Sequence, residues 1–221
     1  MGMDRKAIIH MLLNTYSHRR YLEIGISKGK NFTSIEAEHK IGIDPSPPPE
    51  LVEQSLNDEC KYFDMTSDDY FNTVANTDDF FDVIFIDGLH VYEQVYRDIV
   101  NSLNHLSTDG YIVVHDCKPT TELMGSPSRT DPKGSQRAWT GDVWKAIVRL
   151  RSFHSDLLVF TLDCDYGCAI VAKRTPQSLL QYSLEEIEAM SFKDLESNYD
   201  SYLNLKQPSY FDEFLATFRK E

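Results

Sequence analysis

The chain has 221 residues, of which 41% are hydrophobic, so it is long enough to bury a substantial core within one large domain. Its formal net charge of -13 argues against a nucleic-acid phosphate track, because such tracks need clustered lysine and arginine. The N-terminal segment has too short an apolar patch for a signal peptide or a membrane span. We therefore expect a cytoplasmic protein with no nucleic-acid or membrane partner.

The hydrophobic pattern predicts one helix and then alternating strands and helices. Apolar residues recur at helical spacing from Ala7 to Thr15, and again over Tyr92–Leu106. Short runs typical of strands occur at Tyr21–Ile24, Ile41–Ile43, Lys61–Phe63, Phe81–Ile86 and Tyr111–Val114. Alternation of this kind predicts a doubly wound, Rossmann-like α/β sheet that is mostly parallel.

The second half of the chain predicts a long loop, a helix, a hairpin and a tail. Lys118–Thr140 is rich in proline, glycine, serine and threonine and is too long for an ordinary connection, which indicates a lid. A helix is expected from Gly141 to Phe153, followed by an antiparallel hairpin of Leu157–Leu162 and Cys168–Lys173. We assign residues 1–175 to one domain and 176–221 to an acidic, aromatic, helical tail that packs on it.

A glycine-containing turn follows the first predicted strand and reads Gly25-Ile-Ser27-Lys-Gly29. Three interpretations compete: a nucleotide-type cofactor loop, a nucleophile elbow with Ser27 as the nucleophile, and an ordinary strand-to-helix turn. The next strand ends at Asp44, nineteen residues after Gly25, where such folds bind ribose hydroxyls. The spacing is not the G-x-G-x-x-G of NAD proteins, and the acid at Glu23 suits a positively charged cofactor.

Polar side chains follow the fourth and fifth predicted strands. Asp87 ends the fourth strand with His90 three residues later, and His115 and Asp116 end the fifth. The carboxyl ends of strands form the ligand crevice in open α/β sheets, so we expect the active site there.

These motifs, in this order, resemble the class I methyltransferases that use S-adenosylmethionine (SAM), over about Tyr21 to Lys173. More narrowly, they resemble the small bacterial metal-dependent O-methyltransferases that act on catechols, caffeoyl esters and macrolide sugars. The resemblance implies a seven-stranded sheet with a C-terminal antiparallel hairpin strand. It also implies SAM as cofactor and a hydroxyl of a sugar or other small molecule as methyl acceptor.

The resemblance assigns cofactor roles to particular positions. The acid and the turn after the first strand contact the methionine end of SAM, Asp44 holds the ribose, and the end of the third strand flanks adenine. The implied cofactor-binding set is Glu23, Gly25, Ser27, Gly29, Asp44, Asp64, Met65 and Asp87. Ser27 departs from the family pattern, which has glycine there.

The resemblance also implies a divalent metal, magnesium or manganese, bound by Asp87, His115 and Asp116, with His90 as general base and Asp87 beside it in catalysis. Magnesium prefers oxygen ligands, so His115 and the neighbouring Cys117 weaken that assignment. Asp87 as a cap of the next helix and His115 as a hydrogen-bonded crevice residue are the structural alternatives. A non-haem iron centre is a further alternative.

The predicted lid carries Arg129, Lys133, Arg137 and Trp139, which would close over the acceptor, and Trp139 or Trp144 would stack on a ring. Two other functions remain open: a serine hydrolase using Ser27, and an inactive SAM-fold protein that binds partners through its tail. A homodimer is compatible with the sequence. Because the sequence shows no export signal, we expect its four cysteines to be reduced thiols.

Overall fold

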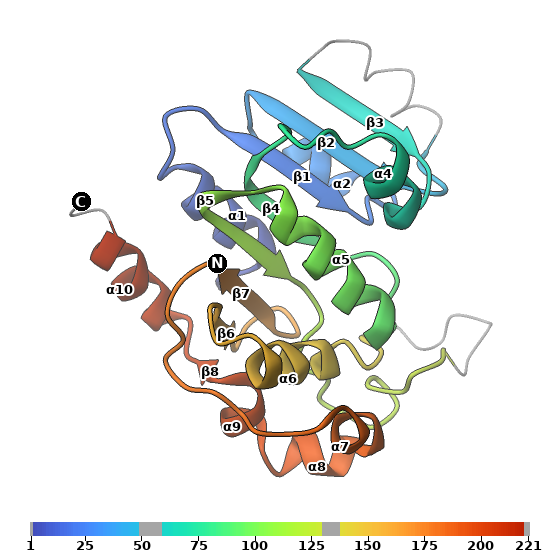
Figure 1. The fold of residues 1–221 in the computed structure, drawn as a ribbon, viewed down its shortest axis with the longest axis vertical. Helices are drawn as coiled ribbons and strands as arrows, with labels where there is room; N and C mark the ends of the chain where they lie inside the picture. Colours follow the sequence, from blue (N-terminus) through green and yellow to red (C-terminus); the bar gives the residue numbers. More distant parts are fainter. Residues whose placement is uncertain (1, 49–58, 130–137, 219–221) are drawn as a thin grey trace.

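The computed structural model describes residues 2–48, 59–129 and 138–218. Within these residues the chain forms one sheet with the strand order β3-β2-β1-β4-β5-β7-β6-β8 (Figure 1). Strands β1 to β5 are parallel, β7 is antiparallel to both β5 and β6, and β8 is parallel to β6. The strands are β1 Arg20–Ile24, β2 His39–Asp44, β3 Cys60–Asp64, β4 Phe81–Ile86, β5 Leu106–Val114, β6 Leu158–Leu162, β7 Cys168–Ala172 and β8 Leu205–Lys206.

The predicted α/β fold with a C-terminal hairpin is therefore confirmed. The structure adds β8, which the sequence did not predict because a two-residue strand is too short to leave an alternating pattern. Strand β2 begins earlier than its apolar run because the polar residues His39 and Lys40 pair with β1. Strand β5 begins earlier because Leu106 pairs with Phe81, ahead of a register shift that precedes the pairing of Tyr111 with Val83.

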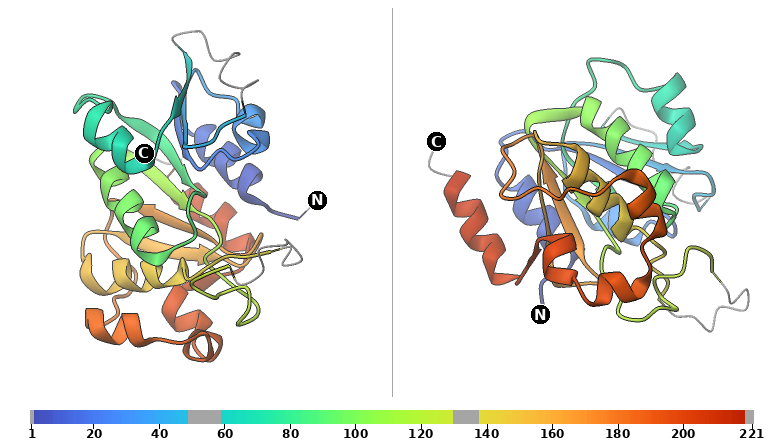
Figure 2. Two further views of the ribbon diagram at one scale, coloured as in Figure 1. Left: turned by 90° about the vertical axis from the view of Figure 1, so that its right-hand side faces the viewer. Right: turned by 60° about the horizontal axis from the view of Figure 1, so that its bottom comes forward.

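Helices cover both faces of the sheet. The described helices are α1 Arg5–Leu13, α2 Lys30–Ser34, α4 Ser67–Thr73, α5 Tyr92–Asn104, α6 Trp144–Phe153, α7 Leu184–Ala189, α8 Phe192–Glu196, α9 Tyr199–Leu203 and α10 Ser209–Phe218. Helices α4 to α9 contribute to the hydrophobic core on one face, and α1, α2 and α10 to the core on the other. Figure 2 shows α1 and α10 across the sheet from α5 and α6. The protein thus has three layers.

The central strands are buried on both faces, which explains why their sequences are continuous apolar runs. Alternate residues of β4 and β5 enter opposite cores: Ile84, Ile86, Ile112 and Val114 on one face, and Val83, Phe85, Tyr111 and Val113 on the other. Side chains along a strand point alternately to the two faces, so each run fills both cores.

The C-terminal helices pack on the body from both sides. On one face the buried Arg151 guanidinium of α6 donates to the backbone oxygens of Tyr202 (2.8 Å) and Ser201 in α9. On the other, Phe211 of α10 is fully buried, and Phe214 of the same helix lies with its ring centroid 4.9 Å from that of Phe160 in β6. Trp144 is also in the core rather than facing a ligand.

None of the helices in the described part of the chain is both long enough and apolar enough to cross a bilayer. All four cysteines lie in the described residues, and none of them forms a disulfide bond.

Phe211→Ala should lower the free energy of unfolding by about 3–5 kcal/mol, because it removes a fully buried ring from the core. Urea unfolding of the purified variant measures this. Leu179→Ala, at a side chain that is 48% exposed, is the control and should change stability by less than about 0.5 kcal/mol. Equal effects of the two substitutions would show that α10 does not belong to the cooperative core.

Candidate active site

The turn after β1 lies directly against the end of β4. Gly25 has φ 88°, and a Cβ atom there would lie 2.3 Å from the backbone oxygen of Asp87, so only glycine fits. The Ser27 N–H donates to Asp44 Oδ2 (2.8 Å), and the Ser46 N–H donates to Asp44 Oδ1 (2.8 Å). The carboxylate that ends β2 therefore holds the turn in place.

A first cavity, of about 360 Å³, opens beside this turn, over the carboxyl ends of β1, β2 and β4. Five of the eight residues predicted to bind a cofactor line it: Gly25, Ser27, Asp44, Met65 and Asp87. The sequence did not indicate Ser67, Gln94 and Asp98, which line the same cavity. Asp98 is buried and accepts hydrogen bonds from Ser67 Oγ (2.6 Å) and Gln94 Nε2 (2.9 Å). The spacing of four between Gln94 and Asp98 on α5 was the available signal.

The other three predicted cofactor residues do not line the first cavity. Asp64 is exposed at the end of β3, and Gly29 precedes α2 with φ 72°. Glu23 is 1% exposed and lies among side chains on the α1 side of β1, where it accepts hydrogen bonds from Tyr21 Oη (2.6 Å) and Asn31 Nδ2 (3.0 Å). Burial raises the pKa of Glu23 to about 7, against the opposing effect of those two hydrogen bonds.

A second cavity, of about 450 Å³, lies on the other side of Asp87. All four polar residues predicted after β4 and β5 line it: Asp87, His90, His115 and Asp116. It also includes Arg129, Trp139 and Tyr166. The two cavities share a wall made of Ser27, Asp87, Gly88 and Leu89. Groups bound in the two cavities would therefore face each other across Asp87.

The imidazole of His90 is fixed by groups on both of its nitrogens. Nδ1 lies 2.7 Å from the backbone oxygen of Trp139 and 3.3 Å from Asp116 Oδ2, and Nε2 lies 3.3 Å from Asp87 Oδ1. A carbonyl can only accept, so the short Nδ1 contact places a proton on Nδ1 and leaves Nε2 as the basic nitrogen of the neutral ring. Burial lowers the pKa of His90, but the contacts with Asp87 and Asp116 outweigh it and raise that pKa.

The described part of the predicted lid packs against His90, through the backbone of Trp139 and Gly141. Met124 O accepts hydrogen bonds from the N–H groups of Thr140 (3.0 Å) and Gly141 (3.1 Å). A Cβ at Gly141 would lie 1.8 Å from the backbone oxygen of His90, so glycine lets this segment reach the imidazole. Lys133 and Arg137, also predicted for the lid, lie outside the described residues.

Two residues that the sequence analysis missed, Arg5 and Asp165, complete the second site. Arg5 Nη1 donates to Asp87 Oδ2 (2.8 Å), and Arg5 Nε donates to Asp165 Oδ2 (2.8 Å). Asp165 lies in the β6–β7 turn, which reaches this edge because β6 runs in the same direction as β5 and β7 begins between them. Helix α1 begins at this edge of the sheet, because its first residue, Arg5, contacts both Asp87 and Asp165.

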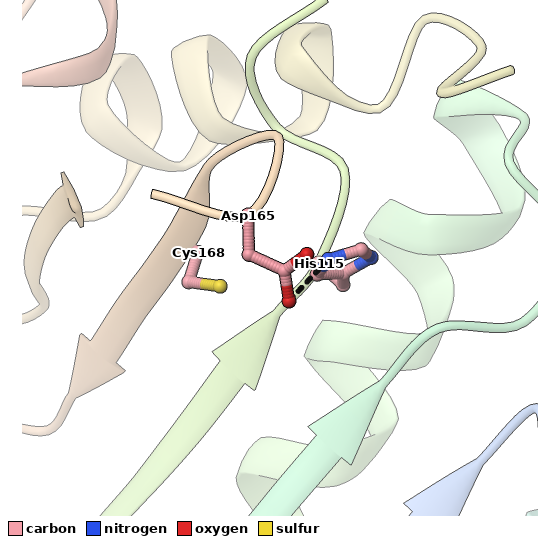
Figure 3. A group of neighbouring side chains, drawn as sticks. All are labelled: His115, Asp165 and Cys168. Carbon is pink, nitrogen blue, oxygen red and sulfur yellow. Dashed lines mark ion pairs between the residues drawn. The ribbon is translucent and has the colours of Figure 1, made fainter. Parts of the chain in front are cut away.

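His115 connects the carboxylates of this site. Its Nδ1 lies 3.1 Å from Asp87 Oδ1 and 3.2 Å from Asp116 Oδ1, and its Nε2 lies 3.4 Å from Asp165 Oδ2, the pair marked in Figure 3. Burial lowers the pKa of His115, but hydrogen bonds with the three carboxylates outweigh it and raise that pKa well above the ordinary value. Burial likewise raises the pKa of Asp87, and the two imidazoles reverse this and lower it well below the usual range.

Backbone strain is concentrated at the same place. Of the five described non-glycine residues with positive φ, four line the second cavity or flank it: Ser27, Asp116, Asp165 and Tyr166. Such conformations cost of order 1–3 kcal/mol each and persist where the surrounding structure holds them. Here the hydrogen bonds of Lys118 N with Tyr166 O (2.6 Å) and Cys117 N with Gly167 O (3.0 Å) tie the end of β5 to the hairpin turn.

Comparison with known proteins identifies the fold. Residues 22–117 match a family model described as a methyltransferase domain. The chain has a class I methyltransferase fold. The predicted resemblance is thereby confirmed, and the matched segment contains the glycine turn, Asp44, Asp87, His90 and both residues that end β5.

Solved structures with this fold include a SAH-bound methyltransferase from Podospora anserina, at 15% identity and a TM-score of 0.56 over 79% of this chain and 80% of that one. Another is an O-methyltransferase from Bacillus cereus in complex with SAH, which is 15% identical in sequence. It has a TM-score of 0.53, over 78% of this chain and 83% of that one. A third, from Staphylococcus aureus, is described as a candidate caffeoyl-CoA O-methyltransferase and is 18% identical in sequence. It has a TM-score of 0.55, over 78% of this chain and 85% of that one. No curated protein sequence matches the chain.

The contacts of Ser27 and Asp87 bear on two alternatives that the sequence left open, a serine hydrolase and a helix-capping role for Asp87. Ser27 bonds through its backbone N–H to Asp44, and the described residues give its hydroxyl no hydrogen bond to a histidine, as a hydrolase would need. Asp87 does not cap α5, because Asp142 Oδ1 accepts from the N–H of Tyr92, the first residue of that helix (2.8 Å).

Glu23→Gln should change how stability depends on pH. The folded-state pKa of Glu23 is raised to about 7, so wild-type protein loses stability as pH rises from the ordinary glutamate value through about 7, by roughly 3 kcal/mol. Glutamine keeps an acceptor for Tyr21 and has no charge to bury. We expect the Tm of the variant, relative to wild type, to be several degrees higher at pH 8 than at pH 5.

Thermal unfolding of both proteins across this pH range provides the measurement. Glu36→Gln, at an exposed glutamate in the loop after α2, is the matched control and should show no such pH-dependent difference. A Tm difference for Glu23→Gln that stays constant from pH 5 to 8 would contradict the assignment.

Proposed function

We propose that this protein transfers the methyl group of SAM to a hydroxyl oxygen of a small molecule. The observation that carries the proposal is the wall of Ser27, Asp87, Gly88 and Leu89 shared by the two cavities. Methyl transfer from a sulfonium is an in-line displacement, so donor and acceptor must meet at one point from opposite sides. One cavity on each side of Asp87 supplies that arrangement.

The first cavity suits the nucleoside end of SAM. Asp44 uses one lone pair on each carboxylate oxygen for the N–H groups of Ser27 and Ser46, and each oxygen retains another for a ribose hydroxyl. Met65 lines the same cavity and offers a soft, apolar surface for adenine. In this proposal Glu23 does not contact SAM. It supports the turn indirectly, by accepting hydrogen bonds from Tyr21 and Asn31.

His90 is the proposed general base. The acceptor oxygen attacks the methyl carbon, the carbon–sulfur bond breaks to leave SAH, and the hydroxyl proton moves to His90 Nε2. The Trp139 carbonyl holds the proton on Nδ1, and Asp87 and Asp116 stabilise the imidazolium that forms. Positioning of donor and acceptor contributes up to about 7–11 kcal/mol in ideal cases.

The second cavity indicates a polar acceptor. Its charged lining mixes cations and carboxylates, and Trp139 and Tyr166 add aromatic rings, a combination that suits a sugar or another hydroxylated small molecule.

A divalent ion is not part of this proposal. The predicted ligands Asp87 and Asp116 have a ligand atom each within 4.8 Å of one another and of His90, as a metal site requires. However, the four oxygens of these two carboxylates already face Arg5, His90 or His115 within 2.8–3.3 Å. An ion would have to displace these groups.

A thermal-shift screen tests the function directly. SAM and SAH should raise the Tm and NADH should not, since a ligand at 100 times its dissociation constant stabilises the folded protein by about 2.7 kcal/mol. Absence of a shift with both SAM and SAH would overturn the proposal. A shift with SAM but no SAH formation on any hydroxylated acceptor would favour the inactive binding protein.

Asp44→Ala should weaken SAH binding by about 1–3 kcal/mol, through loss of the hydrogen bonds to the ribose and of the anchor for the turn. Isothermal titration calorimetry measures the change. Asp64→Ala is the matched control, because Asp64 ends the neighbouring strand opposite Asp44 but does not line the first cavity. Equal losses in the two variants would place the cofactor elsewhere on the sheet edge.

His90→Ala should leave SAH affinity nearly unchanged and lower turnover at least about a hundredfold, the usual scale for loss of a general base. SAH release in the presence of an acceptor provides the readout. His18→Ala removes an imidazole that is 87% exposed and serves as the control. Turnover by His90→Ala at the wild-type rate would remove this residue from the mechanism.

A further inference from the structure

Arg5 contacts two carboxylates of the second site, those of Asp87 and Asp165, through both its side chain and its backbone. Its guanidinium donates to Asp87 Oδ2 and Asp165 Oδ2, each at 2.8 Å, and Nη2 reaches Asp165 Oδ1 at 3.4 Å. Its backbone N–H donates to Asp165 Oδ2 as well (3.1 Å). Arg5 is the first residue of α1, which Asp4 caps by accepting from Ala7 N–H at 2.9 Å, so backbone and side chain are fixed together.

The guanidinium occupies the place that a divalent ion would need. The predicted metal ligands Asp87 and His115 are the groups that Arg5 Nη1 contacts, at 2.8 Å to Oδ2 and 3.2 Å to Nδ1. A bound ion would need the lone pair of Asp87 Oδ2 to which Nη1 donates, and it would have to lie as close to His115 as Nη1 does. Unlike a lysine or histidine, arginine stays charged at all working pH values, so it cannot vacate the position by losing a proton.

The same side chain also covers the other group of potential ligands. His115, Asp165 and Cys168 lie close enough together to suggest a metal centre (Figure 3). Arg5 takes both oxygens of Asp165.

Arg5 remains accessible from the second cavity. Its side chain is 30% exposed and lines that cavity beside His90 and Asp116. When the acceptor hydroxyl loses its proton, negative charge develops on the oxygen, and a fixed cation nearby stabilises it as a metal would. Removal of Arg5 would leave Asp87 and Asp165 as partly buried carboxylates with one cation fewer.

We propose that Arg5 is the resident cation of the second site, that it keeps divalent ions away from Asp87 and His115, and that it replaces the metal of related O-methyltransferases. The role toward the acceptor oxygen rests on the proposed function. The exclusion of ions does not, because it concerns only the contacts of Arg5 with this chain's own residues.

Binding of Mn²⁺ to the whole protein tests the exclusion without any need for turnover. The electron paramagnetic resonance signal of free Mn²⁺ falls as the ion binds, which gives both stoichiometry and affinity. Wild-type protein should show no site that depends on Asp87. Arg5→Met should gain one Mn²⁺ per chain, bound at least tenfold more tightly than any ion on wild type, and Arg5→Met with Asp87→Asn should lose it.

Arg19→Met is the matched control, because it removes the same charge from a half-buried position just before β1, at the end of that strand opposite the site. It should not gain the Mn²⁺ site. If Arg5→Met does not fold, as judged by its urea unfolding transition, Arg5→Gln replaces it and keeps an N–H donor toward Asp87.

Two results would overturn the proposal. One is a Mn²⁺ ion on wild-type protein that Asp87→Asn abolishes. The other is a folded Arg5 variant with no more affinity for Mn²⁺ than Arg19→Met. Failure of the methyltransferase proposal would appear separately, as absence of any Tm shift with SAM and SAH, and would leave the Mn²⁺ comparison intact.

Discussion

The close approach between the turn after β1 and the end of β4 is the contact on which the site depends. Asp87 N–H donates to Ile24 O (2.9 Å), and Gly25 leaves 2.3 Å between a hypothetical Cβ and the Asp87 oxygen. Because the backbones meet there, the first cavity opens on one side of Asp87 and the second on the other. A side chain at Gly25 would separate these two elements and break the wall that the two cavities share.

Asp87 is negatively charged, and the site is built to keep it so. Three carboxylates, those of Asp87, Asp116 and Asp165, face Arg5 and two imidazoles whose pKa values are raised. Partly buried charges are costly without partners, so removal of one member leaves another uncompensated. The charge network therefore explains both why Asp87 stays ionised and why the cation beside it needs to be permanent.

Residues with a left-handed backbone surround this charge network, and backbone hydrogen bonds hold them in that conformation. The left-handed conformations of Asp116, Asp165 and Tyr166 turn the end of β5 and the hairpin toward each other, and backbone hydrogen bonds between them hold both. Gly141 lets the backbone after Trp139 come close to His90, and the carbonyl of Trp139 fixes the tautomer of that imidazole. In the proposed mechanism a base held in this way is ready for proton transfer without rearrangement, which is the physical advantage of a preorganised site.

The sequence alone predicted the alternation of strands and helices up to the hairpin, the glycine turn after β1, and the polar residues at the ends of β2, β4 and β5. These follow from local periodicity and from the rule that parallel strands share one edge. It did not reveal Arg5 or Asp165. These residues precede β1 and follow β6, about 160 positions apart, and no local pattern connects them. Only the tertiary structure decided that α1 returns to the same edge as the β6–β7 turn, and that the cation between Asp87 and Asp165 is supplied by the chain itself.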